Sequence, residues 1–130
     1  MDLAHVFVCG NPALDFAATL RARRTLCFEA LVSPDRLDAW YVESGVVDAV
    51  TPSAPADVAR AREVREAVYA LVTARRRGEA YDVGALATVN AAAREPAAAP
   101  QLTPAGRWTQ ATPAEALAAV ARQAVELLSG

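Results

Sequence analysis

The sequence has 130 residues, of which 54% are hydrophobic, and its formal net charge at pH 7 is −2. A chain of this length forms one domain and buries enough surface to fold without a disulfide or metal staple. The small negative charge excludes a nucleic-acid-binding surface that covers the whole domain. The arginine-rich runs at 21–24 and 75–77 come with no predicted recognition element, so they do not by themselves indicate DNA binding.

The cysteines and the N-terminus indicate the compartment. The sequence contains two cysteines, Cys9 and Cys27, and no secretory signal, so we expect reduced thiols and not a disulfide framework. The N-terminus lacks a basic start and a long apolar run, and no segment reaches the apolar length of a bilayer span. We therefore expect a cytoplasmic protein without membrane contacts.

The N-terminal third predicts a strand followed by a helix. Residues 5–9 are apolar, β-branched and aromatic, which is typical of a strand, and Gly10 ends it. Asn11 is a good N-cap and precedes a proline, so we expect a helix over about 12–20. Residues 21–24 predict an exposed turn. Residues 25–32 fit either an extended segment or a helical turn.

Capping residues predict the next two helices. Ser33 begins a helix that carries Leu37, Trp40 and Tyr41 on one face and ends near Gly45, for which we expect a left-handed conformation. A proline-containing loop follows over 46–56. The longest helix is then expected over 57–77, where arginines in the last turn and Gly78 end it.

The C-terminal half predicts two helices around a hairpin. Asp82 can cap a helix over about 83–95, with Val83, Leu86 and Val89 inward. Residues 101–110 read as a β-hairpin around a Pro-Ala-Gly turn. A capping box then opens the last helix, over about 113–128.

These elements predict a mainly α (α+β) fold. We expect an orthogonal bundle of about five helices, with a small antiparallel sheet in which strand 5–9 joins the hairpin near 101–110. Alanine contributes much of the hydrophobic content but little core volume. The expected core anchors are Leu14, Phe16, Leu37, Trp40, Tyr41, Val64, Val68, Leu71, Leu86, Trp108, Leu117, Val120 and Leu127.

The sequence offers little catalytic or metal-binding chemistry. Its soft metal ligands are His5, Cys9 and Cys27, without the paired short spacing of a zinc site. It has no Gly-x-Ser-x-Gly motif, phosphate-binding loop or dinucleotide fingerprint. We therefore expect no metal, no cofactor and no enzymatic activity from this chain.

Asp15 allows two interpretations. It is either an acid at a helix start that fixes the preceding turn, or a polar group in a small pocket with Thr19, Trp40 and an arginine such as Arg65. Buried paired acids are more often structural than functional. The sequence leaves both interpretations open.

The motif Gly10-Asn11-Pro12-Ala13-Leu14-Asp15-Phe16, followed by Ala18-Thr19, resembles the opening of the ABATE domain. That domain is the N-terminal half of the bacterial CGNR zinc-finger proteins, described as stress-induced transcription regulators. Residues 35–40 and 64–71 resemble the second helix of the family and its Leu-Arg-Glu-Ala helix. The resemblance marks as structural motif positions Gly10, Asn11, Pro12, Phe16, Asn90 and Trp108.

Two departures from the family pattern stand out. The family usually has asparagine at the position of Ala18, and its zinc finger should begin after a helix that ends like residues 127–130. The resemblance therefore implies a single ABATE-like domain over 1–130. It also implies that zinc and DNA contact belong to a C-terminal finger that is absent from these residues, so we expect either the N-terminal piece of a longer protein or a relative without a finger.

The resemblance implies a regulatory domain that senses a small molecule, dimerises, or does both. Its candidate ligand pocket comprises Asp15, Thr19, Trp40 and Arg65, and its expected partners are an unknown small molecule and a second copy of the chain. The alternatives are an enzyme that processes a small molecule and a pure protein-interaction module. An enzyme would need several titratable groups that converge in one pocket.

Overall fold

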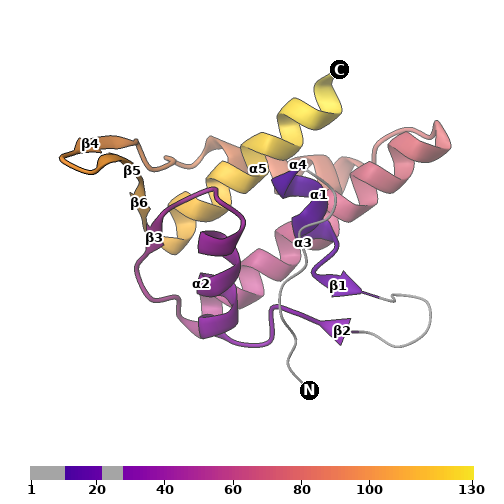
Figure 1. Cartoon of the computed structure of the whole chain (residues 1–130). Helices are drawn as coiled ribbons and strands as arrows, with labels where there is room; N and C mark the ends of the chain where they lie inside the picture. Colours follow the sequence, from indigo (N-terminus) through magenta and orange to yellow (C-terminus); the bar gives the residue numbers. More distant parts are fainter. Residues whose placement is uncertain (1–10, 22–27) are drawn as a thin grey trace.

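The computed structural model describes residues 11–21 and 28–130, and Figure 1 shows how their elements are arranged. This part of the chain contains five helices: α1 (Pro12–Ala17), α2 (Pro34–Glu43), α3 (Pro55–Arg77), α4 (Val83–Arg94) and α5 (Pro113–Ser129). The strands are β1 (Leu20–Arg21), β2 (Phe28–Glu29), β3 (Ala49–Val50), β4 (Gln101–Thr103), β5 (Gly106–Trp108) and β6 (Gln110–Ala111). The predicted mainly helical fold of about five helices is confirmed. The described strands form three separate two-stranded sheets, of which β3–β6 is parallel, where the sequence predicted one small antiparallel sheet. The predicted strand at 5–9, Gly10 and the pairing of that strand with the hairpin lie outside the described residues.

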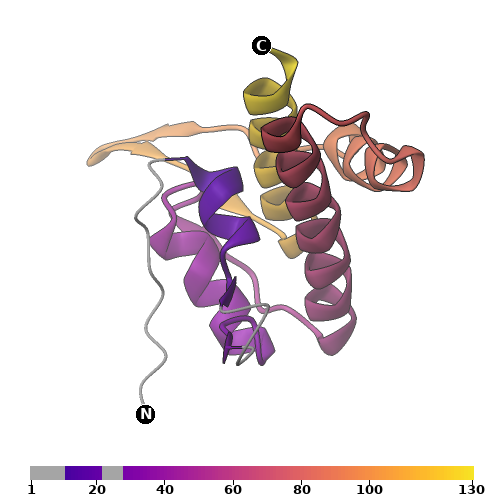
Figure 2. The ribbon, with the colours of Figure 1, turned by 90° about the vertical axis from the view of Figure 1, so that its right-hand side faces the viewer.

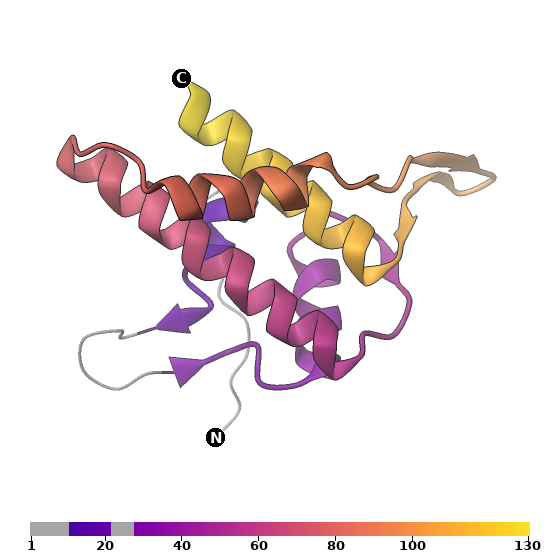
Figure 3. The same ribbon diagram turned by 180° about the vertical axis from the view of Figure 1, so that it is seen from behind.

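The two long helices α3 and α5 form the middle layer of the molecule. α4 packs against both of them on one side, and α1 packs against both on the other side, next to α2 (Figure 2). Seen from behind, α4 lies across this pair (Figure 3). The buried side chains of α3 and α5 are mainly alanine, valine and leucine at helical spacing, so the apolar stripes predicted from the sequence form the core.

Side-chain caps begin four of the helices as expected. Asn11, Ser33, Asp82 and Thr112 each accept a hydrogen bond from a backbone N–H of the first turn. At α5, Glu115 completes the capping box, because its Oε1 accepts from the Thr112 N–H at 2.8 Å. Satisfying these N–H groups fixes where each helix starts.

Two glycines end helices in the left-handed conformation that the sequence predicts. Gly45 follows α2 with φ of 83°, and Gly78 follows α3 with φ of 66°. A side chain at either position would strain the backbone, so glycine is favoured there.

Two helix boundaries differ from the prediction. α1 ends at Ala17 and not near residue 20, because the Thr19 hydroxyl donates to the Phe16 carbonyl at 2.7 Å and the chain turns into β1. α3 begins at Pro55, two residues before the predicted start, and the Asp57 carboxylate accepts from the Ala54 N–H at 2.7 Å. The undecided segment at 25–32 ends in an extended conformation, because β2 pairs antiparallel with β1.

A parallel pairing inside the predicted loop was missed. The predicted loop over 46–56 contains β3, which pairs in parallel with β6 from the segment before α5, so Ala49 lies beside Gln110. The Asp48 carboxylate reinforces the pairing by accepting from the Thr109 N–H at 2.7 Å. Two residues give no alternating pattern, so the sequence could not indicate this strand.

The predicted hairpin forms, but two expected core residues are exposed. β4 and β5 pair around a turn that ends at Gly106, and the hairpin projects from the helices (Figure 1). Trp108 is therefore 45% exposed, and its assignment to the core was wrong.

The inward position predicted for Val83 was also wrong. Val83 is 81% exposed because it is the first residue of α4 and precedes the buried stripe of that helix. The remaining anchors that are only half-buried are Leu14, Leu86 and Leu127.

Candidate functional site

The four residues of the predicted pocket are all buried. Asp15 and Thr19 lie at α1 and just after it, Trp40 lies in α2 and Arg65 lies in α3. The Thr19 hydroxyl donates to the Phe16 carbonyl, so part of its hydrogen-bonding capacity serves the end of α1. Thr19 therefore has a structural role. That the four residues line a ligand pocket stays a prediction.

Aromatic packing joins α1 to α2 beside these residues. The ring centroids of Phe16 and Trp40 are 5.0 Å apart at an interplanar angle of 55°. Trp40 also meets Tyr41 at 6.0 Å in an edge-on arrangement. Such tilted pairs contribute roughly 0.5 to 1.5 kcal/mol beyond the area they bury. This packing accounts for Phe16 as a structural motif residue.

Arg65 is buried, with 3% of its surface exposed, and is held by two carboxylates. Its Nη1 lies 2.5 Å from Glu29 Oε2, and its Nε lies 2.7 Å from Glu66 Oε2. Glu29 also pairs with Arg62 at 3.2 Å. A buried guanidinium is costly unless it is paired, so these contacts explain how α3 tolerates a charge next to the core.

Sequence reasoning missed Glu29. Residues 25–32 carry no clear periodicity, so nothing placed this carboxylate near α3. The only available indication was physical: an arginine on the buried stripe of a helix requires an acidic partner. The structure supplies that partner through the β1–β2 pair.

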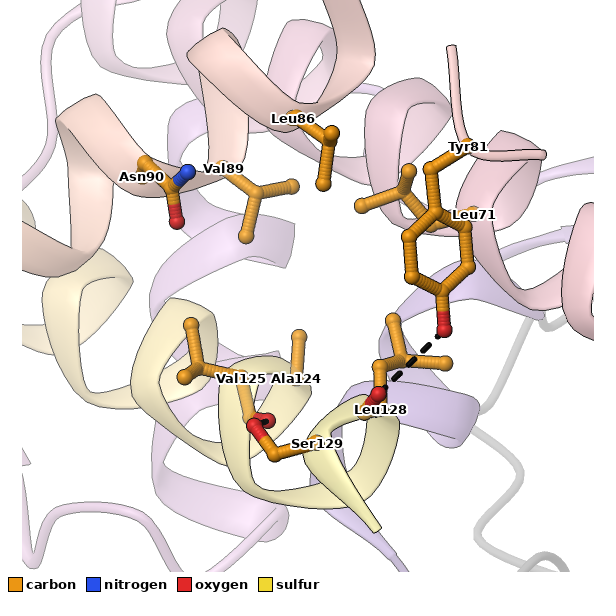
Figure 4. Close-up of a pocket in the computed structure, with 9 residues that line it drawn as sticks. All are labelled: Leu71, Tyr81, Leu86, Val89, Asn90, Ala124, Val125, Leu128 and Ser129. Atoms are coloured by element: carbon orange, nitrogen blue, oxygen red, sulfur yellow. Dashed lines mark hydrogen bonds between the residues drawn. The ribbon is translucent and has the colours of Figure 1, made fainter. Parts of the chain in front are cut away.

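One groove, here called the α5-end groove, lies between the end of α5, the start of α4 and the end of α3 (Figure 4). It has a volume of about 150 Å³. In Figure 4, side chains of α4 face those of α5 across the opening, and Tyr81 closes one side. The lining residues are Leu71, Tyr81, Leu86, Val89, Asn90, Ala124, Val125, Leu128 and Ser129.

Two side chains hold the last turn of α5 at this groove. The Tyr81 hydroxyl donates to the Leu128 carbonyl at 3.2 Å. The Arg75 guanidinium donates to the same carbonyl at 2.9 Å and to the Gly130 carbonyl at 2.6 Å. The last carbonyls of a helix accept no hydrogen bond from inside the helix, so Tyr81 and Arg75 provide the donors that these carbonyls lack. Asn90, singled out in the sequence, lies on the α4 wall of the same groove.

The second groove, here called the α3-start groove, lies at the opposite end of the same three helices. Its volume is about 320 Å³, and its lining mixes polar and apolar side chains. The lining residues are Tyr41, Asp57, Arg60, Ala92, Glu95, Pro113, Ala114, Leu117 and Ala118. Neither groove is lined by any of the four residues of the predicted pocket.

Tyr41 stays protonated in this setting. Burial raises the pKa of its phenol above the ordinary value of 10.0, and the negative charges of Asp57 and Asp38 raise it further. A protonated phenol offers one donor and an acceptor oxygen. The hydroxyl can therefore serve as a neutral hydrogen-bonding group in the wall of the α3-start groove.

Residues 11–21 and 28–130 form neither a metal site nor a membrane span. No group of three or more His, Cys, Asp or Glu side chains is placed to hold a metal ion in that part of the chain. No helix there combines the length and apolar composition that crossing a bilayer requires.

The described residues form a mainly helical domain with small two-stranded sheets and a groove at each end of the α3, α4 and α5 helices. Residues 10–130 match the model of the ABATE family, whose description is "Putative stress-induced transcription regulator". The chain therefore belongs to the ABATE family, as its N-terminal motif predicted. Comparisons with curated proteins and with solved structures gave no match.

Proposed function

We propose that this domain is the regulatory part of a stress-induced bacterial transcription regulator and that it senses a small molecule in the α5-end groove. The observation that carries the proposal is the position of the groove beneath the last turn of α5, which Tyr81 and Arg75 hold in place. The family resemblance implies a zinc finger after a helix like α5. A ligand that contacts Val125 and Leu128 would stabilise that turn and so restrict the orientation of such a finger.

The lining of the groove indicates an apolar ligand. Five of its nine residues are Leu, Val or Ala side chains of α4 and α5, and an apolar cavity of this volume takes a molecule roughly the size of benzene. Asn90, Ser129 and the Tyr81 hydroxyl can hydrogen-bond one polar group of such a molecule. The proposed ligand is a small aromatic or aliphatic compound with one polar substituent.

Binding explains this groove better than catalysis does. The described residues that line it include no carboxylate, imidazole, thiol or basic side chain, whereas enzyme sites bring several such groups together. We accordingly propose a non-enzymatic domain of the cytoplasm that holds no zinc itself and reaches DNA only through a finger outside residues 1–130.

Thermal unfolding with toluene and phenol as probes tests this proposal. Both should raise the melting temperature of the wild-type domain, because a ligand that binds only the folded state stabilises it. Val125→Phe fills the groove from a half-exposed position and should abolish the rise. Val83→Phe makes the same change at an exposed position of α4 outside the groove and should keep it. An equal rise in Val125→Phe, or none in the wild type, would contradict the proposal.

The projecting hairpin favours dimerisation as a second candidate function. Leu102 is 89% exposed and pairs with Arg107, while Trp108 pairs with Gln101, so the two apolar side chains lie on opposite faces of the ribbon. Tryptophan is enriched at protein interfaces, so a second copy of the chain could pack on the Trp108 face or on the Leu102 face of the hairpin. Light scattering at two protein concentrations should show a dimer that Leu102→Ser weakens. A monomer at both concentrations would exclude this function.

A further inference from the structure

The α3-start groove has the composition of a second ligand site. It lies where the starts of α3 and α5 meet the end of α4, and its volume of about 320 Å³ falls in the range of small-molecule pockets. Its apolar part comes from α5 and α4, mainly Pro113, Ala114, Leu117 and Ala92. Its polar part comes from side chains of α2, of the first turns of α3 and of the residue that follows α4.

Tyr41 contributes a hydroxyl-bearing side chain to the lining of this groove. Tyr41 is only 1% exposed, and its hydroxyl makes no hydrogen bond with any residue in the part of the chain that the structure describes. Asp57 lines the same groove, and its negative charge, with that of Asp38, helps to raise the pKa of this phenol. A hydroxyl without a partner inside the protein can donate to a ligand in the groove or accept from it.

The charges of the groove favour a cation. Asp57 and Glu95 contribute two negative charges, and Arg60 contributes one positive charge. Arg60 already pairs with Glu63 at 3.3 Å, so its charge is partly neutralised from outside the groove. An ammonium group would meet two carboxylates and the lone pairs of a phenol oxygen, all acceptors that an N–H donor requires.

We infer that the α3-start groove binds a small organic amine in its ammonium form, with the apolar body of the molecule on α5 and its ammonium group toward Asp57, Glu95 and the Tyr41 hydroxyl. This site is separate from the α5-end groove, and the inference does not depend on the proposed function. It assigns a ligand class to a groove in which acids, a buried hydroxyl and an apolar wall occur together.

An NMR titration of the whole chain with hexylamine tests the inference, with hexanoate and hexan-1-ol as probes of the same length. Hexylamine should shift backbone amides of residues 57–60, 92–95 and 114–118 in a saturable way. Hexanoate and hexan-1-ol should bind these residues at least about tenfold more weakly, because neither offers an ammonium to the carboxylates.

Conservative substitutions separate the groups of the site. Tyr41→Phe removes only the hydroxyl and should weaken hexylamine binding about tenfold. Asp57→Asn keeps an acceptor for the Ala54 N–H while removing the charge, and it should weaken binding by a similar factor. Glu95→Gln, at an exposed position, should weaken it only about threefold. Glu126→Gln removes an exposed acid outside the groove and should leave binding unchanged.

Three results would overturn the inference. These are an unchanged affinity in Tyr41→Phe and Asp57→Asn, equal binding of all three probes, and the absence of any saturable shift, which would mean that the groove holds only water. Toluene binding at residues 86–90 and 124–129 reports on the proposed function separately, so each idea can fail without the other.

Discussion

The grooves at the two ends of the α3, α4 and α5 helices differ in the polarity of their lining, although the same three helices build both. The α5-end groove is lined by apolar side chains with amide and hydroxyl groups, and the α3-start groove contains Asp57, Arg60 and Glu95. Helix direction explains part of this difference. α3 and α5 both start at the polar end, where acids such as Asp57 and Glu115 satisfy free N–H groups.

At the other end, α3 and α5 terminate, and donors are needed in place of acceptors. Arg75 and Tyr81 provide them to the last carbonyls of α5. The donors come from α3 and from the segment between α3 and α4, so the end of α5 depends on groups from outside its own helix. The capping requirements of helix ends therefore distribute charge between the two grooves.

The largest expected effect comes from shortening an apolar wall. Leu71 is buried at the α5-end groove, so Leu71→Ala should lower the free energy of unfolding by about 2 to 4 kcal/mol through lost burial and an enlarged cavity. Urea denaturation measures this loss. Leu117→Ala at the α3-start groove is the matched variant, because Leu117 is also buried. An unchanged free energy of unfolding in Leu71→Ala would contradict the prediction.

High pH should act mainly at the polar end. The pKa of Tyr41 is raised in the folded state by burial and by Asp57 and Asp38, so the unfolded chain loses the phenol proton first. The stability linked to Tyr41 is therefore fully present below about pH 10 and falls above it, by about 1.4 kcal/mol per pH unit. Denaturation of wild type and Tyr41→Phe between pH 8 and pH 11 measures it, and parallel curves would contradict the prediction.

Releasing the end of α5 should have a smaller and local effect. Arg75→Ala removes donors from the Leu128 and Gly130 carbonyls and should cost up to about 1 kcal/mol. Hydrogen exchange should become faster in the last turn of α5 and stay unchanged at its start. Arg77→Ala is the control in the same turn of α3. Faster exchange along all of α5 would contradict the prediction, because it would show that the last turn of α5 does not open separately from the start of the helix.

The smallest effects distinguish the two tyrosines. Tyr41→Phe removes a hydroxyl that makes no hydrogen bond within the described residues, so at pH 7 stability should change by less than about 0.5 kcal/mol. Tyr81→Phe removes a bond to Leu128 and should cost roughly 0.5 to 1 kcal/mol. Thermal unfolding of the two variants side by side compares them. A larger loss in Tyr41→Phe would mean that its hydroxyl already has a partner.

The sequence predicted the helices well because their starts and ends depend on local chemistry. Asn11, Ser33, Asp82 and Thr112 cap helices where expected, and Gly45 and Gly78 end them. The strands were harder to predict because β3 and β6 are two residues each and come together from distant parts of the chain. Trp108 was placed in the core because aromatic residues are usually buried, but its hairpin projects into solvent.

The candidate site was only partly accessible from sequence. Trp40 lies on the buried face of α2 as predicted, and Arg65, which was predicted only as a pocket residue, is buried as well. Glu29, which neutralises Arg65, lies in a segment with no clear pattern. Both grooves depend on how α3, α4 and α5 pack together, which no local motif encodes. Asn90 was noted through the family resemblance, and only the packing of α4 against α5 places it in a groove wall.

One NMR experiment tests most directly whether the two ends are separate sites. Toluene and hexylamine are titrated into the wild-type chain, alone and together. Toluene should shift amides of residues 86–90 and 124–129, and hexylamine should shift those of residues 57–60, 92–95 and 114–118. Each set should respond to its own probe when both are present. Shifts of one common set of residues by both probes, or competition between them, would contradict the account.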